Sequence, residues 1–399
     1  MKNVILLTID ALRKDALGCY GGGDLTPFID SLQDRAIRFN NAHSPGPYTQ
    51  AAFPAILTSS YYLEYGRQKM LSGKRVLISE VLKKKGISTA GCHSNAYLCE
   101  YFGWNRGWDF FYDSMEEEVD DKIPYIKAMP LNERVGNWLR SRKEKDNPFF
   151  LWLHYMDVHE PYVPERKYVE TVDPSIEITD DQMFSLFSDV LMKRDVSDNK
   201  AIELLKKLYL AHVREVDEAV EEFFGILEKV DCLKDTVIII TSDHGDEFNE
   251  HGGLSHDGKM FSELVAIPLL IYDSTTHKGK VCETLVSTID VSPTIAHLFG
   301  LDPVNAFEGH SLLPLEDYPV KGVYGEAFDK YGNHETGKEK EVYYYLEGEF
   351  KSIYRETDDS WKLYDLKTDP GELNNIMESS EHASHMKQKL IPRIKRHLR

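Results

Sequence analysis

Acidic and imidazole side chains follow directly on apolar runs at two distant places in the chain. Asp243 and His244 come after the β-branched run 237–240, and Asp10 comes after the apolar run 4–9. An aspartate and a histidine together offer the oxygen and nitrogen ligands that a divalent cation accepts in proteins. Each aspartate could equally cap a loop, and His244 could be a surface residue, so these residues alone leave a metal site and an ordinary loop both open.

A threonine stands where a loop passes into a predicted helix. Residues 42–48, A-H-S-P-G-P-Y, have the composition of a loop, and the residues from Thr49 onward, T-Q-A-A-F-P-A-I-L-T-S, are typical of a helix. Free N–H groups and the helix dipole favour an anion at such an N-terminus, and a bound cation would favour it further. The Thr49 hydroxyl is therefore a candidate nucleophile. A threonine is also a common helix cap, which is the structural alternative.

The elements that must position these groups are strands buried on both faces. The runs before Asp10 and Asp243, and a third run at 148–157, are apolar without alternation, which is typical of a parallel sheet covered by helices. Apolar spacing over 206–230 predicts one such helix. We therefore predict an α/β fold with a mostly parallel sheet flanked by helices. Ligands of these sheets bind at the carboxyl ends of the strands, so Asp10 and Asp243 would meet if their strands are neighbours.

The chain changes character near residue 316. The stretches V-Y-Y-Y-L, G-E-F-K-S-I-Y-R-E and W-K-L-Y-D-L indicate short strands separated by turns, and a basic helix follows them at the end of the chain. This pattern predicts a catalytic domain over residues 1–315. Residues 316–399 would form a small C-terminal α+β subdomain with an antiparallel sheet and a terminal helix.

The composition argues against several classes of function. The chain has 47 Lys and Arg against 66 Asp and Glu, a net charge of -19, whereas a nucleic-acid partner requires clustered cations. No run approaches the roughly 18 apolar residues of a membrane span. The five cysteines have no zinc-like spacing, and the N-terminus has no signal-peptide cleavage site. We therefore expect reduced cysteines, no nucleic-acid partner, no membrane span and a cytoplasmic location.

Four motifs together resemble the sulfatase family of the alkaline phosphatase superfamily. They are T-I-D-A-L-R-K-D, a helix ending in I-L-T-S, T-S-D-H-G-D-E-F-N-E-H-G with a later His256, and L-Y-D-L-K-T-D-P-G-E-L-N-N. They occur in the order of the family and span residues 8–375. The resemblance implies an alkaline-phosphatase-like sheet and metal-dependent hydrolysis of a small anionic sulfate or phosphate ester.

The resemblance also implies roles for single residues. The expected metal ligands are Asp10, Thr49, Asp243 and His244. They would hold one divalent ion, which could be Mn, Mg, Ca or Zn because the sequence does not choose among these.

Substrate contacts follow from the same resemblance. Thr49 would attack the ester, while His159 and His256 would contact the transferred group or protonate the leaving oxygen. Asn95 is a further candidate for substrate binding, with a structural role in its loop as the alternative. A less favoured arrangement with a second metal ion would use Asp157, His159 and His256 as its ligands.

One departure from the family pattern concerns the nucleophile. Sulfatases carry Cys or Ser in a C/S-x-P-x-R signature that is oxidised to formylglycine, whereas this chain has T-Q-A-A-F at residues 49–53. A secondary alcohol cannot form that aldehyde. Ala11 also stands where sulfatases tend to have a second N-terminal aspartate.

Both differences resemble the phosphodiesterase, phosphatase and lipoteichoic-acid-synthase-like branches of the superfamily. The predicted function is therefore hydrolysis of a phosphate ester or phosphodiester with Thr49 as nucleophile. The alternatives are a sulfuric ester hydrolase of the arylsulfatase type and a non-catalytic protein that retains the fold. The sequence does not indicate the natural substrate or the oligomeric state.

Overall fold

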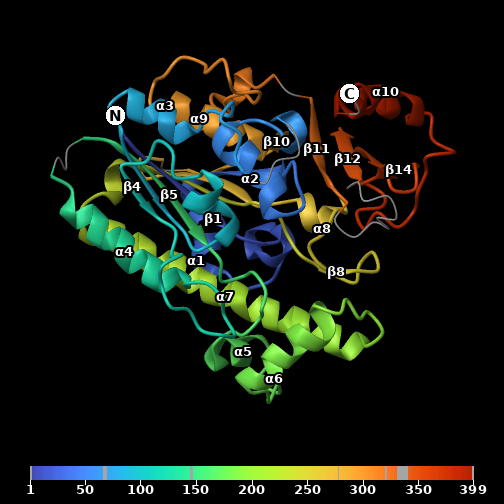
Figure 1. The fold of residues 1–399 in the computed structure, drawn as a ribbon, viewed down its shortest axis with the longest axis horizontal. Coiled ribbons are helices and arrows are strands. Elements are labelled where there is room, and N and C mark those ends of the chain that lie inside the picture. Colours follow the sequence, from blue (N-terminus) through green and yellow to red (C-terminus); the bar gives the residue numbers. More distant parts are fainter. Residues whose placement is uncertain are drawn as a thin grey trace.

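An eight-stranded mixed sheet lies at the centre of the computed structural model (Figure 1). The structure describes residues 2–65, 70–143, 147–276, 278–319, 321–329 and 340–397. The strands run across the sheet in the order β10-β2-β9-β6-β1-β5-β3-β4. Their bounds are β1 (Asn3–Ile9), β2 (Ala36–His43), β3 (Ser88–Cys92), β4 (Phe110–Tyr112), β5 (Phe149–Tyr155), β6 (Thr236–Ser242), β9 (Leu269–Asp273) and β10 (Lys280–Ser287).

The pairing of these strands is mostly parallel, which confirms the predicted fold class. β1 lies between β5 and β6 and runs parallel to both, and β2–β10, β3–β4 and β3–β5 are also parallel pairs. Only β9 runs antiparallel to its neighbours, β2 and β6. The register pairs Ile9 of β1 with Ser242 of β6. Asp10 and Asp243 therefore leave adjacent strands at the same edge of the sheet.

Helices cover both faces of the sheet because residues of each central strand point alternately into two cores. In β1, Ile5 and Leu7 belong to one hydrophobic core, and Val4 and Leu6 belong to the other. The first core is covered by helices that include α4 and α7, and the second by α2, α3 and α9 (Figure 1). The helices of the first face are α1 (Pro27–Leu32), α4 (Ala128–Ser141), α5 (Arg166–Val172) and α7 (Asn199–Lys229). Those of the second are α2 (Thr49–Thr58), α3 (Ile78–Lys84) and α9 (Val291–Leu298).

Helix α7 begins earlier than the sequence predicts. The predicted start is residue 206, whereas the helix begins at Asn199. The Asp198 side chain accepts hydrogen bonds from the backbone N–H groups of Lys200 and Ala201, which caps the added turns. The first added turn also carries Ile202, which is buried against the core.

A second, antiparallel sheet follows near the C-terminus and lies beside the main sheet (Figure 1). It consists of β11 (Gly322–Phe328), β12 (Glu341–Glu347), β13 (Phe350–Arg355) and β14 (Ser360–Asp365), paired in that order. One face packs on α10 (Ala383–His397), and the other packs on the segment around Tyr48 and on α8 (Ser262–Val265). The antiparallel sheet and terminal helix agree with the sequence pattern, and the domain boundary at residue 315 stays a prediction.

The smaller elements lie outside the two sheets. The short strands β7 (Glu247–Phe248) and β8 (Leu254–Ser255) form a two-stranded ribbon, and α6 (Asp180–Leu186) precedes α7.

Two further predictions concern the cysteines and the membrane. All five cysteines are free thiols. Within the described ranges, no helix combines the length and apolar character needed to cross a bilayer. The cytoplasmic location stays a prediction.

Candidate active site

Asp10 and Asp243 each use one carboxylate oxygen for internal hydrogen bonds and leave the other without one. Oδ1 of Asp243 accepts from the backbone N–H groups of Ala11 (3.3 Å) and His244 (3.0 Å). Oδ2 of Asp10 accepts from Nδ2 of Asn95 at 2.8 Å. The other two oxygens, Oδ1 of Asp10 and Oδ2 of Asp243, are buried and have no hydrogen-bond partner among the described residues. Two buried carboxylate oxygens are therefore available to bind a cation.

His244 directs a nitrogen lone pair at those two oxygens. Its Nδ1 lies 2.9 Å from the carbonyl oxygen of Gly245, and because a carbonyl can only accept, Nδ1 carries the proton and Nε2 a lone pair. Nε2 lies 3.4 Å from Oδ1 of Asp10 and 3.4 Å from Oδ2 of Asp243. Burial is the largest influence on the pKa of His244 and lowers it, which favours the neutral ring.

Thr49 brings a hydroxyl to the same place. It is the first residue of α2 and is buried, and its Oγ1 lies 3.5 Å from Oδ2 of Asp10 and 3.4 Å from Nε2 of His244. Asp10, Thr49, Asp243 and His244, which the sequence proposed as a set from three distant segments, are thus brought together by the fold. The N-terminus of α2 also places the positive end of a helix dipole at this hydroxyl.

The donor set fits a divalent cation. Ligand atoms of Asp10, Asp243 and His244 all lie within 4.8 Å of one another. The 3.4 Å separations from His244 Nε2 are close to the spacing of neighbouring ligands around an ion whose bonds are about 2.1 Å long. Burial, and next the charge of Asp10, raises the pKa of Asp243 well above its ordinary value. A cation between the two carboxylates would relieve this repulsion.

The surrounding histidines keep the other carboxylate ionised. Burial by itself would raise the pKa of Asp10, but the charge of His159 and the hydrogen bond from His154 hold it below its ordinary value. Asp10 is therefore the more acidic member of the carboxylate pair.

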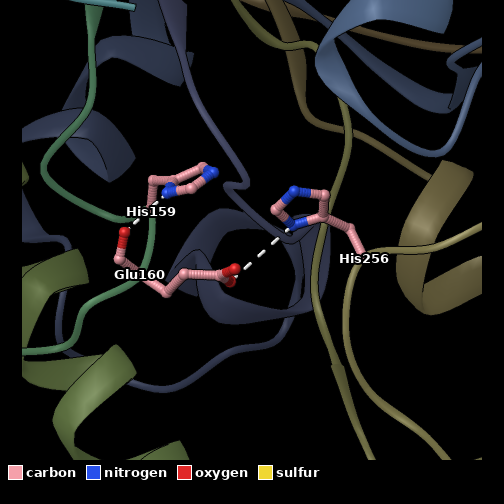
Figure 2. A group of neighbouring side chains, drawn as sticks. All are labelled: His159, Glu160 and His256. Atoms are coloured by element: carbon pink, nitrogen blue, oxygen red, sulfur yellow. Dashed lines mark hydrogen bonds and ion pairs between the residues drawn. The ribbon is translucent and has the colours of Figure 1, made fainter. Parts of the chain in front are cut away.

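His159 and His256 lie side by side (Figure 2). Their ring centroids are 5.0 Å apart, and the ring of His256 is 4.5 Å from that of His244. Nδ1 of His159 donates to the carbonyl oxygen of Glu160 at 2.7 Å, and Figure 2 shows its second nitrogen turned toward His256. The fold therefore brings both predicted substrate histidines to the predicted metal ligands.

The two histidines differ in charge. Burial lowers the pKa of His159, but the carboxylates of Asp10, Glu160 and Asp246 outweigh it and raise the pKa to about 9. Burial holds the pKa of His256 well below its ordinary value. The pair therefore offers one protonated and one neutral imidazole near neutral pH.

Asn95 lies at the site, where its side chain contacts the candidate metal ligand Asp10. Its Oδ1 accepts from the backbone N–H of Tyr97 at 2.9 Å, which turns Nδ2 toward Asp10. His93 in turn lies under the Asn95 backbone, whose N–H is 3.2 Å from its Nδ1. Asn95 thus orients Asp10, and its binding of substrate stays a prediction.

The carboxylate of Asp157 is not grouped with His159 and His256, where the less favoured second-metal arrangement would place it. Its two oxygens lie 3.1 and 2.8 Å from the backbone N–H of Ala128, the first residue of α4, so this carboxylate caps a helix. Glu160 lies beside the histidine pair instead (Figure 2), and its carboxylate could share a metal ion with His159 and His256. Its Oε2 is 3.8 Å from Nδ1 of His256, the nitrogen that His256 directs at Asp246.

Sequence reasoning missed Asp246 and His154. Oδ1 of Asp246 lies 2.8 Å from Nδ1 of His256, and its Oδ2 accepts from the hydroxyl of Tyr162 at 2.5 Å, so Asp246 orients the His256 ring. Asp246 follows Asp243 by three residues in D-H-G-D, which is a signal that could have been used. His154 lies inside the apolar strand β5, where a histidine gives no local sign of function.

The comparison with known families gives a direct answer. The model of the family described as "Sulfatase" matches residues 2–301, and one described as "N-sulphoglucosamine sulphohydrolase, C-terminal" matches residues 250–398. The chain belongs to the sulfatase family. This confirms the resemblance that the four motifs indicated.

Named relatives and solved structures agree with this membership. An N-acetylglucosamine-6-O-sulfatase of Bacteroides thetaiotaomicron is 24% identical over 477 residues, covering 97% of this chain and 84% of the relative. Among solved structures, a protein that was solved in complex with its substrate D-glucosamine-2-N,6-O-disulfate has a TM-score of 0.83 at 22% identity. The match covers 99% of this sulfatase-family chain and 98% of that protein's chain. A phosphonate monoester hydrolase of Agrobacterium radiobacter has a TM-score of 0.80 at 20% identity, covering 100% and 96%.

These comparisons bear unequally on the predicted function. The structural matches are below 25% identity and show the fold. Sequence relatives that are named as sulfuric ester hydrolases include the N-acetylglucosamine-6-O-sulfatase and an "Arylsulfatase" of Clostridium perfringens, which is 23% identical and covers 95% of this chain and 91% of the relative. They favour the sulfuric ester alternative over the phosphate ester that the sequence put first.

Proposed function

We propose that this sulfatase-family protein is a metal-dependent hydrolase of a small anionic ester, with Thr49 as the nucleophile. One observation carries the proposal. The Thr49 hydroxyl lies within 3.5 Å of two residues, Asp10 and His244, that have buried ligand atoms facing a common point. A routine helix cap would instead have its oxygen on the backbone of its own helix, and Thr49 directs its oxygen at the candidate ligands.

Asp10, Asp243 and His244 would hold the cation, with Thr49 beside it. When bound, a divalent cation supplies positive charge that favours an ionised hydroxyl and neutralises a substrate anion. The chain contributes the N-terminus of α2, whose dipole favours negative charge on the Thr49 oxygen.

The two histidines take different roles: His159 transfers protons, and His256 contacts the substrate. The Thr49 hydroxyl would first release its proton to solvent. In the first step a bond forms between Thr49 Oγ1 and the substrate centre while the bond to the leaving oxygen breaks, and protonated His159 gives its proton to that oxygen. In the second step His159, now neutral, takes a proton from water as the water oxygen bonds to the substrate centre and the bond to Thr49 Oγ1 breaks, which restores the ionised Thr49 oxygen and protonated His159. His256 is neutral and oriented by Asp246, so it is suited to contact the oxygens of the transferred group.

The substrate class has two candidates. The names of the relatives support a sulfuric ester. The residue at position 49 supports a phosphoric or phosphonic ester, because a threonine cannot provide the aldehyde hydrate by which family members of the Cys or Ser type cleave sulfate. We propose that phosphorus esters are hydrolysed faster than the matched sulfate ester by this chain. A non-catalytic role is disfavoured because all of the predicted ligands meet in one buried place.

Paired chromogenic substrates test the proposal. The metal-stripped chain is reloaded with Mn²⁺, Mg²⁺, Ca²⁺ or Zn²⁺ and assayed on 4-nitrophenyl sulfate, 4-nitrophenyl phosphate and 4-nitrophenyl phenylphosphonate. We expect turnover that depends on the added metal, highest for a phosphorus ester. Thr49→Ala should lower kcat by about a thousandfold or more, and Thr49→Ser should retain part of the activity.

Thr58→Ala serves as the matched control. Thr58 is buried at the other end of the same helix, and its hydroxyl donates to the carbonyl oxygen of Pro54. This variant should keep wild-type kcat. Undiminished activity of Thr49→Ala on any of the three esters would exclude Thr49 as the nucleophile, and a preference for the sulfate would select the sulfuric ester.

A further inference from the structure

A chain of buried hydrogen-bonding groups runs beneath Asp10. Nε1 of Trp152 donates to Oγ1 of Thr8 at 3.1 Å, the same oxygen lies 2.9 Å from Nδ1 of His154, and Nε2 of His154 lies 3.2 Å from Oδ2 of Asp10. All four side chains are fully buried. Nothing in the proposed chemistry uses Trp152, Thr8 or His154, although they end on a candidate metal ligand.

The sheet itself builds this arrangement. Thr8 of β1 and His154 of β5 are register partners, and Trp152 precedes His154 by two residues on the same strand, so its side chain lies on the same face. The ring of Phe53, from the helix that begins at Thr49, packs edge to face on His154 with centroids 5.0 Å apart. Because the ring is enclosed on this side, no water can replace its hydrogen bonds.

The direction of each hydrogen bond follows from the donors available. The indole N–H of Trp152 can only donate, so it occupies one lone pair of the Thr8 oxygen. The single proton of Thr8 has two possible acceptors, Nδ1 of His154 at 2.9 Å and the carbonyl oxygen of Leu153 at 3.5 Å. The shorter contact is the stronger bond. His154 then carries its proton on Nε2, facing the Asp10 carboxylate, whereas the other tautomer would set a lone pair against that anion.

We propose that His154 is a positioning residue for Asp10, held in its Nε2–H tautomer by Thr8 and Trp152. With Asn95, it occupies Oδ2 of Asp10 and so leaves Oδ1 directed at His244 and Asp243. This inference deepens the proposed function and rests on it, because His154 would orient Asp10 toward the proposed divalent cation. Groups that orient a ligand in this way typically alter metal affinity by 10- to 100-fold.

Mn²⁺ affinity measures the effect without any substrate. Isothermal titration of the metal-stripped full-length chain should give a dissociation constant at least tenfold higher for His154→Phe and for Thr8→Val than for the unsubstituted chain. Thr241→Val is the matched control. Thr241 is buried and is the register partner of Thr8 on β6, but its hydroxyl donates to the carbonyl oxygen of Pro268. Its Mn²⁺ affinity should stay within twofold of wild type.

Neutron diffraction of the metal-free crystal tests the tautomer directly. We expect a deuteron on Nε2 of His154 and the Thr8 deuteron directed at Nδ1. A deuteron on Nδ1, wild-type Mn²⁺ affinity in both His154→Phe and Thr8→Val, or an equal loss in Thr241→Val would each overturn the inference. Failure of the unsubstituted chain to bind Mn²⁺ would contradict the proposed function instead, and the deuteron positions would still decide the role of His154.

Discussion

The candidate ligands share one property at the scale of single residues. Each commits one polar atom to the protein and keeps another for the site: Asp10 and Asp243 through their second oxygens, and His244 through Nε2 once Nδ1 has donated to Gly245. The committed atoms fix the direction of the remaining ones. A site built this way loses little conformational entropy when an ion enters, because its ligands are already ordered.

Holding two carboxylates close together should lower the free energy of unfolding of the metal-free chain, and a substitution at Asp243 can measure this effect. Asp243→Asn keeps an oxygen to accept from Ala11 and removes a buried charge that Asp10 repels. In the presence of EDTA, this variant should be more stable than wild type by about 1–3 kcal/mol in urea unfolding. Its Mn²⁺ affinity should fall at least a hundredfold. Equal stability of the two proteins without metal would show that the carboxylates do not repel each other in the folded chain.

Elements rather than single residues decide which groups meet. β1 and β6 are parallel neighbours in register, so the residues that follow them emerge side by side. α2 then begins at this edge and presents its first residue, Thr49. On the same scale, Asp157 follows β5 and caps α4, which removes it from the site although it lies only two residues before His159.

The capping carboxylate of α4 should make stability depend on pH. Burial, and next the charge of Glu215, raises the pKa of Asp157 to about 7. In the unfolded chain this group ionises near pH 4. Between about pH 4 and 7 the folded chain therefore binds more protons than the unfolded one, and stability falls as pH rises through that window.

Asp157→Asn removes this titration while its side-chain oxygen can still accept from Ala128. Its stability relative to wild type should rise by about 1–4 kcal/mol between pH 4.5 and pH 8, as measured by urea unfolding at both values. It should also bind as many Mn²⁺ ions per chain as wild type. Parallel stability profiles would refute the raised pKa, and a lost Mn²⁺ ion would restore Asp157 as a ligand.

The sequence was informative where the signal was local. The apolar runs before Asp10 and Asp243 and the loop-to-helix transition at Thr49 identified elements whose ends carry chemistry, and these groups do meet. Strand order was not accessible in this way. β9 is an apolar strand like its neighbours, and its antiparallel insertion between β2 and β6 depends on partners far away in the chain.

Support groups were the part of the site that the sequence could not supply. His154 lies within an apolar strand, and its importance comes from Thr8 and Asp10 across a strand pair, 146 and 144 residues away. Asp246 gains its role only when the chain turns back to bring His256 next to it. Such contacts depend on the tertiary fold: the spacing in D-H-G-D could single out Asp246 but not its partner, and no spacing singles out His154.

At the scale of the whole molecule, the C-terminal sheet supports the segment that delivers Thr49. The hydroxyl of Tyr344 on β12 donates to the carbonyl oxygen of Ser44 at 2.7 Å. The backbone N–H of Glu326 on β11 donates to the carbonyl oxygen of Pro45 at 2.8 Å, and that of Phe328 donates to the hydroxyl of Tyr48 at 2.9 Å. The loop immediately before the nucleophile is thus held from the outside by the second sheet.

Loosening that support should lower both stability and activity. Tyr344→Phe leaves the buried carbonyl of Ser44 without this donor and should cost about 1–3 kcal/mol of stability. Amide hydrogen exchange over residues 44–50 should become faster, and kcat should fall about three- to tenfold. Tyr343→Phe, the neighbouring substitution on β12 whose hydroxyl donates to Glu341, is the control and should leave exchange in that loop unchanged. Equal amide exchange of residues 44–50 in both variants would show that the Tyr344 hydrogen bond does not stabilise the loop before Thr49.

The most direct test of the central claim is an anomalous diffraction map from crystals of the Mn²⁺-loaded chain. The account predicts a single strong peak among Oδ1 of Asp10, Oδ2 of Asp243 and Nε2 of His244, with Thr49 Oγ1 beside it and each ligand at about 2.0–2.3 Å. A peak elsewhere, or no peak at these three atoms in a crystal that holds Mn²⁺, would contradict the claim that these side chains form the metal site.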